Sequence, residues 1–241
     1  MPNQEHIVSS FDRDLEGIQT KIMRMGGMVE ESIANASTAL TTRDIELAQA
    51  VRKADRTIDA AEIDLNEEAA RIIALRQPAA SDLRILLSVF RVSGNLERIG
   101  DYAKNIAKRS EAVIALPSVP GDAAALKRMA RQVEMMLKDV LDAYIQRNAD
   151  LAEDVRQRDL EVDQMYSALF REYLTHMMED PRHITTCMHL HFMAKNIERM
   201  GDHVTSIAEQ VVYLVTGEAP TDDRPKDDET AFVKGRLNDG W

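Results

Sequence analysis

The segment Asn95–Asp101 reads NLERIGD, and Asn196–Asp202 reads NIERMGD, 101 residues further along the chain. A second stretch, Arg43–Asp59, matches Arg147–Asp163 at several positions with a shift of 104 residues. Self-similarity at a nearly constant period indicates that one structural unit has been duplicated. The sequence therefore predicts two copies of the same fold within a chain of 241 residues.

The repeated unit is predicted to be helical. Apolar residues recur at intervals of three and four over long stretches, and turn signals divide these stretches into six. Aromatic residues make up only 5 % of the chain, which favours helix over strand. Asp44 and Ser81 are the expected N-caps of the second and third helices. The six predicted helices span about 9–40, 44–75, 81–115, 123–147, 150–178 and 182–216.

The predicted fold class is all-α, with two tandem antiparallel three-helix bundles whose six long helices are related by the internal repeat. The bundles comprise residues 5–116 and 122–217, and a proline-containing linker joins them. An acidic tail, residues 218–241, carries few apolar residues and is expected to be disordered.

Bulk properties exclude several classes of function. With a formal net charge of −11, the surface repels nucleic acid. Cys187 is the only cysteine, which excludes an internal disulfide and a thiolate zinc site. We find no signal-peptide pattern and no apolar run near the ~20 residues that span a bilayer. We therefore expect a cytoplasmic protein that reaches membranes only through partners. It also lacks a glycine-rich phosphate loop and a nucleophile–base pair, so we do not expect an enzyme.

The repeat preserves acidic pairs at a spacing of four residues. Residues four apart share one helical face, so each pair presents two carboxylates side by side, at a cost of roughly 0.2–0.5 kcal/mol even on an exposed helix. One such pair means little, but two at matching places in each half indicate a purpose. The four pairs are Asp55 with Asp59, Glu97 with Asp101, Asp159 with Asp163, and Glu198 with Asp202.

These acids continue apolar stripes instead of facing away from them. In the third predicted helix, the stripe that begins at Leu83 and Leu87 runs on to Glu97 and Asp101. A second apolar face, which includes Leu96, lies on the far side of the same helix, so we expect this helix to be packed on both sides. The carboxylates are therefore expected to be partly desolvated, a costly state unless protons or cations neutralise them.

Clusters of oxygen ligands suit hard metal ions: magnesium, manganese, calcium or iron, with zinc possible. The Glu-x-x-His pairs of ferritin-like di-iron proteins are missing, since Gly100 and Gly201 stand where those histidines would be. Glycine is costly inside a helix, so these two indicate either close approach of a backbone or ligand, or simple helix packing. Among the histidines, His191 and His203 are the only candidate additional ligands.

The motifs resemble those of the PhoU family. The resemblance is carried by Arg76-Gln77-Pro78, by Asp82-Leu83-Arg84, and by the repeated segments 95–107 and 196–203, and it extends over nearly all of residues 5–216. It implies two three-helix bundles, a homodimer, and metal bound at the repeated acidic motifs. The acids that match these motifs are Asp55, Asp59, Glu97 and Asp101 in the first repeat and Asp159, Asp163, Glu198 and Asp202 in the second.

The resemblance also implies a function. Proteins of this family restrain phosphate import and the phosphate-starvation response, by linking the ATPase of the high-affinity phosphate transporter to a PhoR-type sensor histidine kinase. The expected cofactors are divalent or trivalent metal ions: iron, zinc, manganese or magnesium. Two other interpretations stay open: a carboxylate-bridged metalloenzyme such as a metal-dependent phosphatase, and a structural bundle whose acids are solvated.

Overall fold

The computed structural model describes residues 2–119 and 122–220, with side chains described from Phe11 to Val119 and from Ala123 to Pro220. Apart from its first three residues, the predicted tail 218–241 lies outside the described residues.

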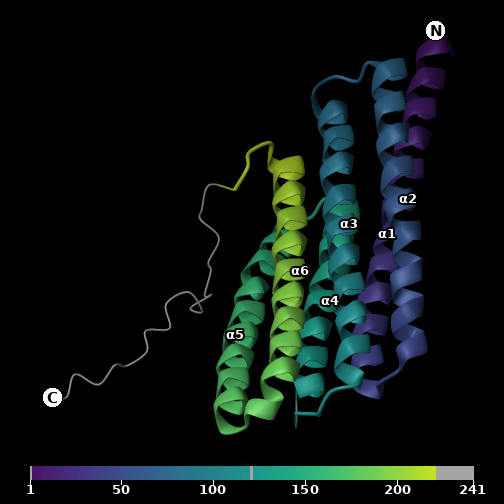
Figure 1. Ribbon diagram of the computed structural model, residues 1–241. Helices are drawn as coiled ribbons and strands as arrows, with labels where there is room; N and C mark the ends of the chain where they lie inside the picture. Colours follow the sequence, from purple (N-terminus) through teal and green to yellow (C-terminus); the bar gives the residue numbers. More distant parts are fainter. Residues whose placement is uncertain (1, 120–121, 221–241) are drawn as a thin grey trace.

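The described chain forms six α-helices, as the sequence predicts, so the prediction of an all-α fold with six long helices is confirmed (Figure 1). A short 3₁₀ turn, η1 (Pro181–His183), precedes the last of them. The α-helices are α1 (Pro2–Thr42), α2 (Ile45–Arg76), α3 (Ala80–Ile114), α4 (Asp122–Gln146), α5 (Ala149–Glu179) and α6 (Ile184–Thr216).

The duplication extends to the way the helices are connected. The Asp44 carboxylate caps α2 by accepting a hydrogen bond of 2.9 Å from the Leu47 backbone N–H, as expected. At the equivalent place in the second half, the Asn148 side chain accepts one of 3.1 Å from the Leu151 N–H and caps α5. Both turns therefore close in the same way, because each offers a short polar side chain directly before the helix.

The start of α3 differs from the prediction. Ser81 lies inside the first turn, and the N-cap position belongs to Ala79, whose side chain makes no capping hydrogen bond. The prediction of a Ser81 cap is wrong because the cap lies two residues earlier than the pattern indicates, within the usual uncertainty of helix ends.

The six helices run alternately up and down and form two packed bundles (Figure 1). The first comprises α1, α2 and α3, and the second comprises α4, α5 and α6. The halves join where α3 packs against α6 and α1 against α4, which leaves α2 and α5 on the two outer flanks. One hydrophobic core passes through both halves, with Leu96 and Ile99 of α3 and Met200 and Val204 of α6 fully buried within it.

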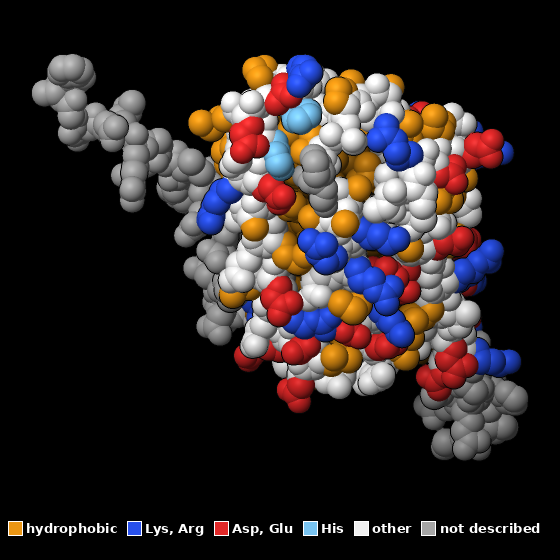
Figure 2. All heavy atoms as spheres, turned by 90° about the horizontal axis from the view of Figure 1, so that it is seen from below, with side chains coloured by type: hydrophobic (Ala, Val, Ile, Leu, Met, Phe, Trp, Pro, Cys, Tyr) orange, Lys and Arg blue, Asp and Glu red, His pale blue; other side chains and the backbone are white. Residues whose placement is uncertain are grey.

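This packing fixes where the repeated acids lie. The acids of the first half project between α2 and α3, and those of the second half between α5 and α6, each pair of helices being in close contact. Within the described residues, no helix combines the length and the apolar character that a bilayer-spanning segment requires. Seen from the end where α6 begins, acidic and basic side chains are interspersed, with apolar side chains between them (Figure 2).

Candidate metal centres

The first acidic cluster lies between α2 and α3, and its members interact. The charges of Asp55, on the same helix, and of Asp101, on α3, both act on Asp59, and those of Asp59 and Asp101 act on Glu97. Glu62, one turn beyond Asp59 on α2, adds a further negative charge near Glu97. The structure therefore brings together all four acids that the sequence predicts for the first repeat.

A lysine side chain partly neutralises this cluster. The Lys104 ammonium donates hydrogen bonds of 2.6 Å to Asp55 Oδ2 and 2.5 Å to Asp101 Oδ1, and so joins α2 to α3. Burial alone lowers the pKa of Lys104, but its hydrogen bonds to the two carboxylates outweigh burial and hold that pKa above the ordinary value. The other oxygen of Asp55, Oδ1, is buried and has no hydrogen-bond partner.

The remaining acids of the first cluster bind protons more tightly than they do in water. Burial raises the pKa of Asp59, and the neighbouring charge of Asp55 raises it further, while Lys104 acts in the opposite direction. Burial also raises the pKa of Glu97, and Asp101 contributes in the same sense. The first cluster therefore retains an unmet demand for positive charge even with Lys104 in place.

The second cluster, between α5 and α6, is drier. Asp159, Asp163 and Glu198 are 1 %, 4 % and 6 % exposed, whereas in the first cluster only Asp55 belongs to the buried residues. Burial is the main cause that raises the pKa of Glu198, and the charges of Asp202 and Asp163 raise it further. These three carboxylates are therefore close enough to interact. The structure therefore also brings these acids of the second repeat together.

A different lysine serves the second cluster. Lys195, one turn before Glu198 on α6, donates a hydrogen bond of 2.9 Å to Glu198 Oε1 and so works against the rise of that carboxyl's pKa. The same ammonium lies 4.8 Å from the centre of the Tyr166 ring of α5, a distance typical of a cation–π contact. Glu198 Oε2 is buried without a hydrogen-bond partner.

The two equivalent glycines bring the helices close together. A Cβ at Gly201 would lie 2.5 Å from Asp159 Oδ1, so the absence of a side chain there lets α6 approach the carboxylate. A Cβ at Gly100 would lie 3.1 Å from Ile58 Cδ1, an apolar contact between α3 and α2. Helix packing therefore accounts for Gly100, while Gly201 admits one of the predicted ligands to the α5–α6 contact.

The two candidate histidines pack against neighbouring side chains, and the buried Nδ1 of His191 has no hydrogen-bond partner. Burial, followed by the charge of Lys195, lowers the pKa of His191, whose ring lies 5.9 Å from that of Tyr166 and 5.3 Å from that of Phe170. His203 Nδ1 lies 2.7 Å from Asn95 Oδ1, so this side chain joins α6 to α3. Both residues contribute to packing in the described structure.

The carboxylate oxygens of both clusters are chemically suited to a hard cation. Their present arrangement would have to change to bind one. Carboxylate oxygens are the ligands that magnesium, manganese and calcium prefer, and Asp55 Oδ1 and Glu198 Oε2 are buried oxygens that a cation would satisfy. Yet among the described side chains no group of three or more acidic, histidine or cysteine residues is already gathered as a ligand set. Metal binding would therefore require the carboxylates of a cluster to move closer together.

Sequence reasoning missed the role of both lysines and the proximity of Glu62. The signal was present in the spacing, because Lys104 follows Asp101 by three residues and Lys195 precedes Glu198 by three, the separation at which opposite charges meet on a helix.

The fold and the site together define a class: a duplicated three-helix protein with one carboxylate cluster, held between two helices, in each repeat. The sequence profile of the PhoU domain matches this chain twice, over residues 22–110 and 126–211. The chain therefore belongs to the PhoU family.

Relatives and solved structures agree with this membership. The chain is 47 % identical to a phosphate-specific transport system accessory protein PhoU homolog of Rhizobium meliloti, over 97 % of this chain and 98 % of the relative. A protein of the same description from Caulobacter vibrioides is 45 % identical, over 92 % and 96 %. The crystal structure of PhoU from Pseudomonas aeruginosa superposes with a TM-score of 0.83 at 40 % identity, covering 86 % of this chain and 100 % of that one. PhoU from Streptococcus pneumoniae gives 0.80 at 30 % identity, covering 87 % and 99 %.

Proposed function

We propose that this protein is a cytoplasmic, metal-binding homodimer that restrains phosphate uptake and the phosphate-starvation response. In this role it is an adaptor between the ATPase subunit of the high-affinity phosphate transporter and a PhoR-type sensor histidine kinase. The observation that carries the proposal is the chain's similarity, over almost its whole length, to accessory proteins of the phosphate-specific transport system.

The acidic clusters support the metal-binding part of the proposal. Interacting carboxylates lie where two helices meet in both repeats, all four in the first and Asp163, Glu198 and Asp202 in the second. In both repeats a buried carboxylate oxygen lacks a hydrogen-bond partner. A bound cation would supply positive charge and join α2 to α3 and α5 to α6. The residues that would hold it are Asp55, Asp59, Glu97 and Asp101 in the first cluster and Asp159, Asp163, Glu198 and Asp202 in the second.

The regulatory part is tested in cells. Deleting the gene is expected to leave phosphate-response genes expressed in high phosphate, and the full-length chain supplied from a plasmid is expected to restore repression. Normal repression in the deletion strain would refute the regulatory role. Co-purification of the chain with the transporter ATPase and the kinase, at high and low phosphate, tests the adaptor role directly.

The metal part is tested on the purified protein. Elemental analysis before and after treatment with a chelator should show stoichiometric metal in the fresh protein. A chelator-sensitive hydrolysis of phosphate monoesters, lost when Asp55 and Glu97 are neutralised, would instead support the metal-dependent phosphatase. The adaptor is expected to show no turnover.

A further inference from the structure

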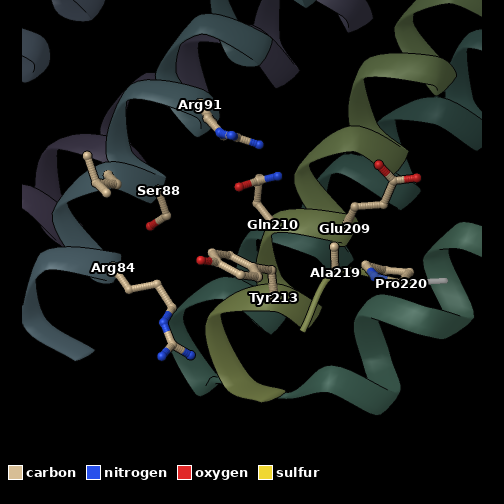
Figure 3. Close-up of a pocket in the computed structure, with 9 residues that line it drawn as sticks. Arg84, Ser88, Arg91, Glu209, Gln210, Tyr213, Ala219 and Pro220 are labelled. Carbon is tan, nitrogen blue, oxygen red and sulfur yellow. The ribbon is translucent and has the colours of Figure 1, made fainter. Parts of the chain in front are cut away.

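A groove runs between α3 and α6 on the side that carries the end of the described chain. It consists of two adjoining hollows of about 490 Å³ and 670 Å³ that share Arg91, Glu209 and Gln210. Figure 3 shows the first hollow, where Arg91 of α3 extends toward Gln210 of α6 and the Tyr213 ring lies between the two helices. The groove is open to solvent and lies at the contact between the two halves.

Three arginines follow one side of this groove. Arg84, Arg91 and Arg98 stand seven residues apart, two turns of helix, so they form a row on α3 with a rise of about 10.5 Å from each to the next. The Arg84 guanidinium lies 5.5 Å from the centre of the Tyr213 ring. Arg98 is 3.7 Å from Glu97 and so belongs partly to the first acidic cluster.

Arg91 differs from Arg84 and Arg98 in its contacts. Its side chain is exposed, and within residues 11–119 and 123–220 it makes no side-chain hydrogen bond, ion pair or ring contact. Arginine is well suited to bind carboxylates, because its planar guanidinium can donate two parallel hydrogen bonds to one carboxylate. An arginine that lines a groove without a partner is therefore available to an anionic ligand.

The internal repeat shows that the fold does not require these arginines. The positions in the second repeat that correspond to Arg84 and Arg91 hold Thr185 and Phe192. Both helices nevertheless have the same length, to within two residues, and the same place in their bundles. The shared three-helix fold therefore does not require arginine at these positions. Arg84 nevertheless packs on Tyr213 and beside Gly217 at the end of α6, whereas Arg91 makes no such contact within residues 11–119 and 123–220.

The charges that face the arginines leave one end of the groove cationic. Glu62 and Glu97 lie in the second hollow and belong to the first acidic cluster. In the first hollow the only carboxylate among the described lining residues is Glu209, which also lies 4.0 Å from Arg156 of α5. Arg84 and Arg91 thus form a local positive site on a chain whose net charge is −11.

Apolar side chains next to this site select the kind of ligand. Leu87, one turn after Arg84 and in the same hollow, is 51 % exposed, and Tyr213 is 38 % exposed. A polyphosphate or a nucleic acid would leave Leu87 uncovered, whereas an amphipathic peptide would cover it and offer carboxylates to the arginines.

We propose that this groove binds an acidic, amphipathic segment of a partner protein, with carboxylates against Arg84 and Arg91 and apolar side chains against Leu87 and Tyr213. The inference rests on the proposed adaptor function, for which it supplies a docking surface. It does not depend on a metal ion, because Arg84 and Arg91 lie outside both acidic clusters.

The binding test uses the full-length chain and a fluorescein-labelled helical peptide that carries Glu and Leu on one face. The Arg84→Glu/Arg91→Glu variant is expected to weaken peptide binding at least about tenfold, and added salt should weaken the parent complex. Lys127→Glu/Arg128→Glu, an equal charge change at two exposed positions of α4, should leave binding within about twofold. Far-ultraviolet circular dichroism and a thermal melt confirm that both variants fold.

Three results would overturn the proposal: equal binding by the groove variant and the parent; displacement of the peptide by tripolyphosphate and not by a second acidic peptide; or a changed oligomeric state of the groove variant in sedimentation equilibrium. The first shows that the arginines are unused, the second assigns the groove to an oxyanion, and the third assigns it to a second copy of this chain.

A cell experiment separates failure of this inference from failure of the proposed function. The groove variant is expressed in the deletion strain, beside the parent and the α4 control. If the deletion derepresses the phosphate-response genes and the groove variant alone fails to restore repression, both proposals are supported. If the groove variant restores repression fully, the docking surface is refuted while the function stands. If the deletion has no effect, the function itself is refuted.

Discussion

The two acidic clusters keep the same four carboxylates but differ in the cation that faces them. In the first repeat Lys104 approaches from the turn after Asp101, and in the second Lys195 approaches from the turn before Glu198. The position that corresponds to Lys195 in the first repeat is Gly94, and the one that corresponds to Lys104 in the second is Thr205.

This difference shows which part of the site the duplication holds constant. The acids stay in place between paired helices, while each repeat draws a lysine from a different direction to meet the same excess of negative charge. A buried carboxylate without a countercharge is costly, so each cluster needs a cation or bound protons to neutralise it. We infer that the lysines neutralise the metal-free state and that the constant acids are there for an ion that replaces them.

The most direct test of the difference between the two clusters is to remove acids from one of them. Asp159→Asn/Glu198→Gln is expected to weaken Mn²⁺ binding at the second cluster at least about 1,000-fold, or about 4 kcal/mol, because two of four charged ligands are lost. The first cluster should keep its affinity, since its ligands come from other helices. Calorimetric titration of chelator-stripped protein measures both sites.

Asp55→Asn/Glu97→Gln is the matched variant. It is expected to weaken Mn²⁺ binding at the first cluster and to leave the second cluster unchanged. Of the two sites, the second should bind more tightly, because its carboxylates are drier and charges interact more strongly away from water. Identical titrations for the parent and both variants would show that neither cluster binds this metal.

Removing the lysines tests the metal-free state. Lys195→Met is expected to cost about 2–3 kcal/mol in the free energy of unfolding, less than for a fully buried pair because the lysine side chain is 28 % exposed. Lys104→Met should cost a similar amount, about 2–3 kcal/mol, since it leaves the Asp55 side chain, which is only 6 % exposed, without its partner. Urea unfolding in the presence of a chelator measures both.

Saturating Mn²⁺ should abolish most of these losses, because the metal supplies the missing charge. Each lysine variant should also bind the metal more tightly than the parent does, since a competing cation has been removed. Losses that persist unchanged with metal would show that the lysines are structural and that no ion takes their place.

Much of the fold can be predicted from the sequence. Long apolar periodicity and the turn residues between helices define the six helices, and Asp44 caps α2 as its position indicates. The repeat places the acids in register, so their pairing between helices follows once each repeat folds as a unit. The second apolar face of α3, which includes Leu96, is buried as expected, whereas Leu87 on the stripe that leads to the acids is 51 % exposed.

Other features depend on which helices become neighbours. An apolar face indicates that a helix is covered but does not identify the element that covers it. The packing of α3 on α6 and the groove lined by Arg91 therefore could not be predicted from α3 alone. The bridge from Lys104 to Asp55 depends on a side-chain rotamer that reaches across to another helix, which the spacing along α3 does not reveal. The difference between Gly100 and Gly201 likewise depends on the atoms opposite them, which sequence spacing does not reveal.

The two glycines offer a smaller test of the same comparison. Gly201→Ala is expected to cost about 1–2 kcal/mol, because the new Cβ would meet the buried Asp159 carboxylate at 2.5 Å. Gly100→Ala should change stability by less than about 1 kcal/mol, since the gain in helix propensity offsets a close contact with the Ile58 side chain. Urea unfolding measures stability, and Mn²⁺ titration should show that only Gly201→Ala disturbs its cluster. Equal costs would mean that Asp159 moves aside as easily as Ile58.

The pH dependence of stability gives the smallest expected effect. Glu97 and Glu198 both have a pKa raised above 4.5, chiefly by burial, so each binds its proton more tightly in the folded chain than in the unfolded one. Stability in the absence of metal should therefore fall as the pH rises from about 4.5 through the raised pKa values.

Glu198→Gln should flatten this decline more than Glu97→Gln, because Glu198 is the more buried of the two. Urea midpoints between about pH 4 and pH 8, in the presence of a chelator, test this order, with Glu67→Gln on the exposed surface of α2 as the control. A decline of the same size in all three variants would show that the clusters do not control it.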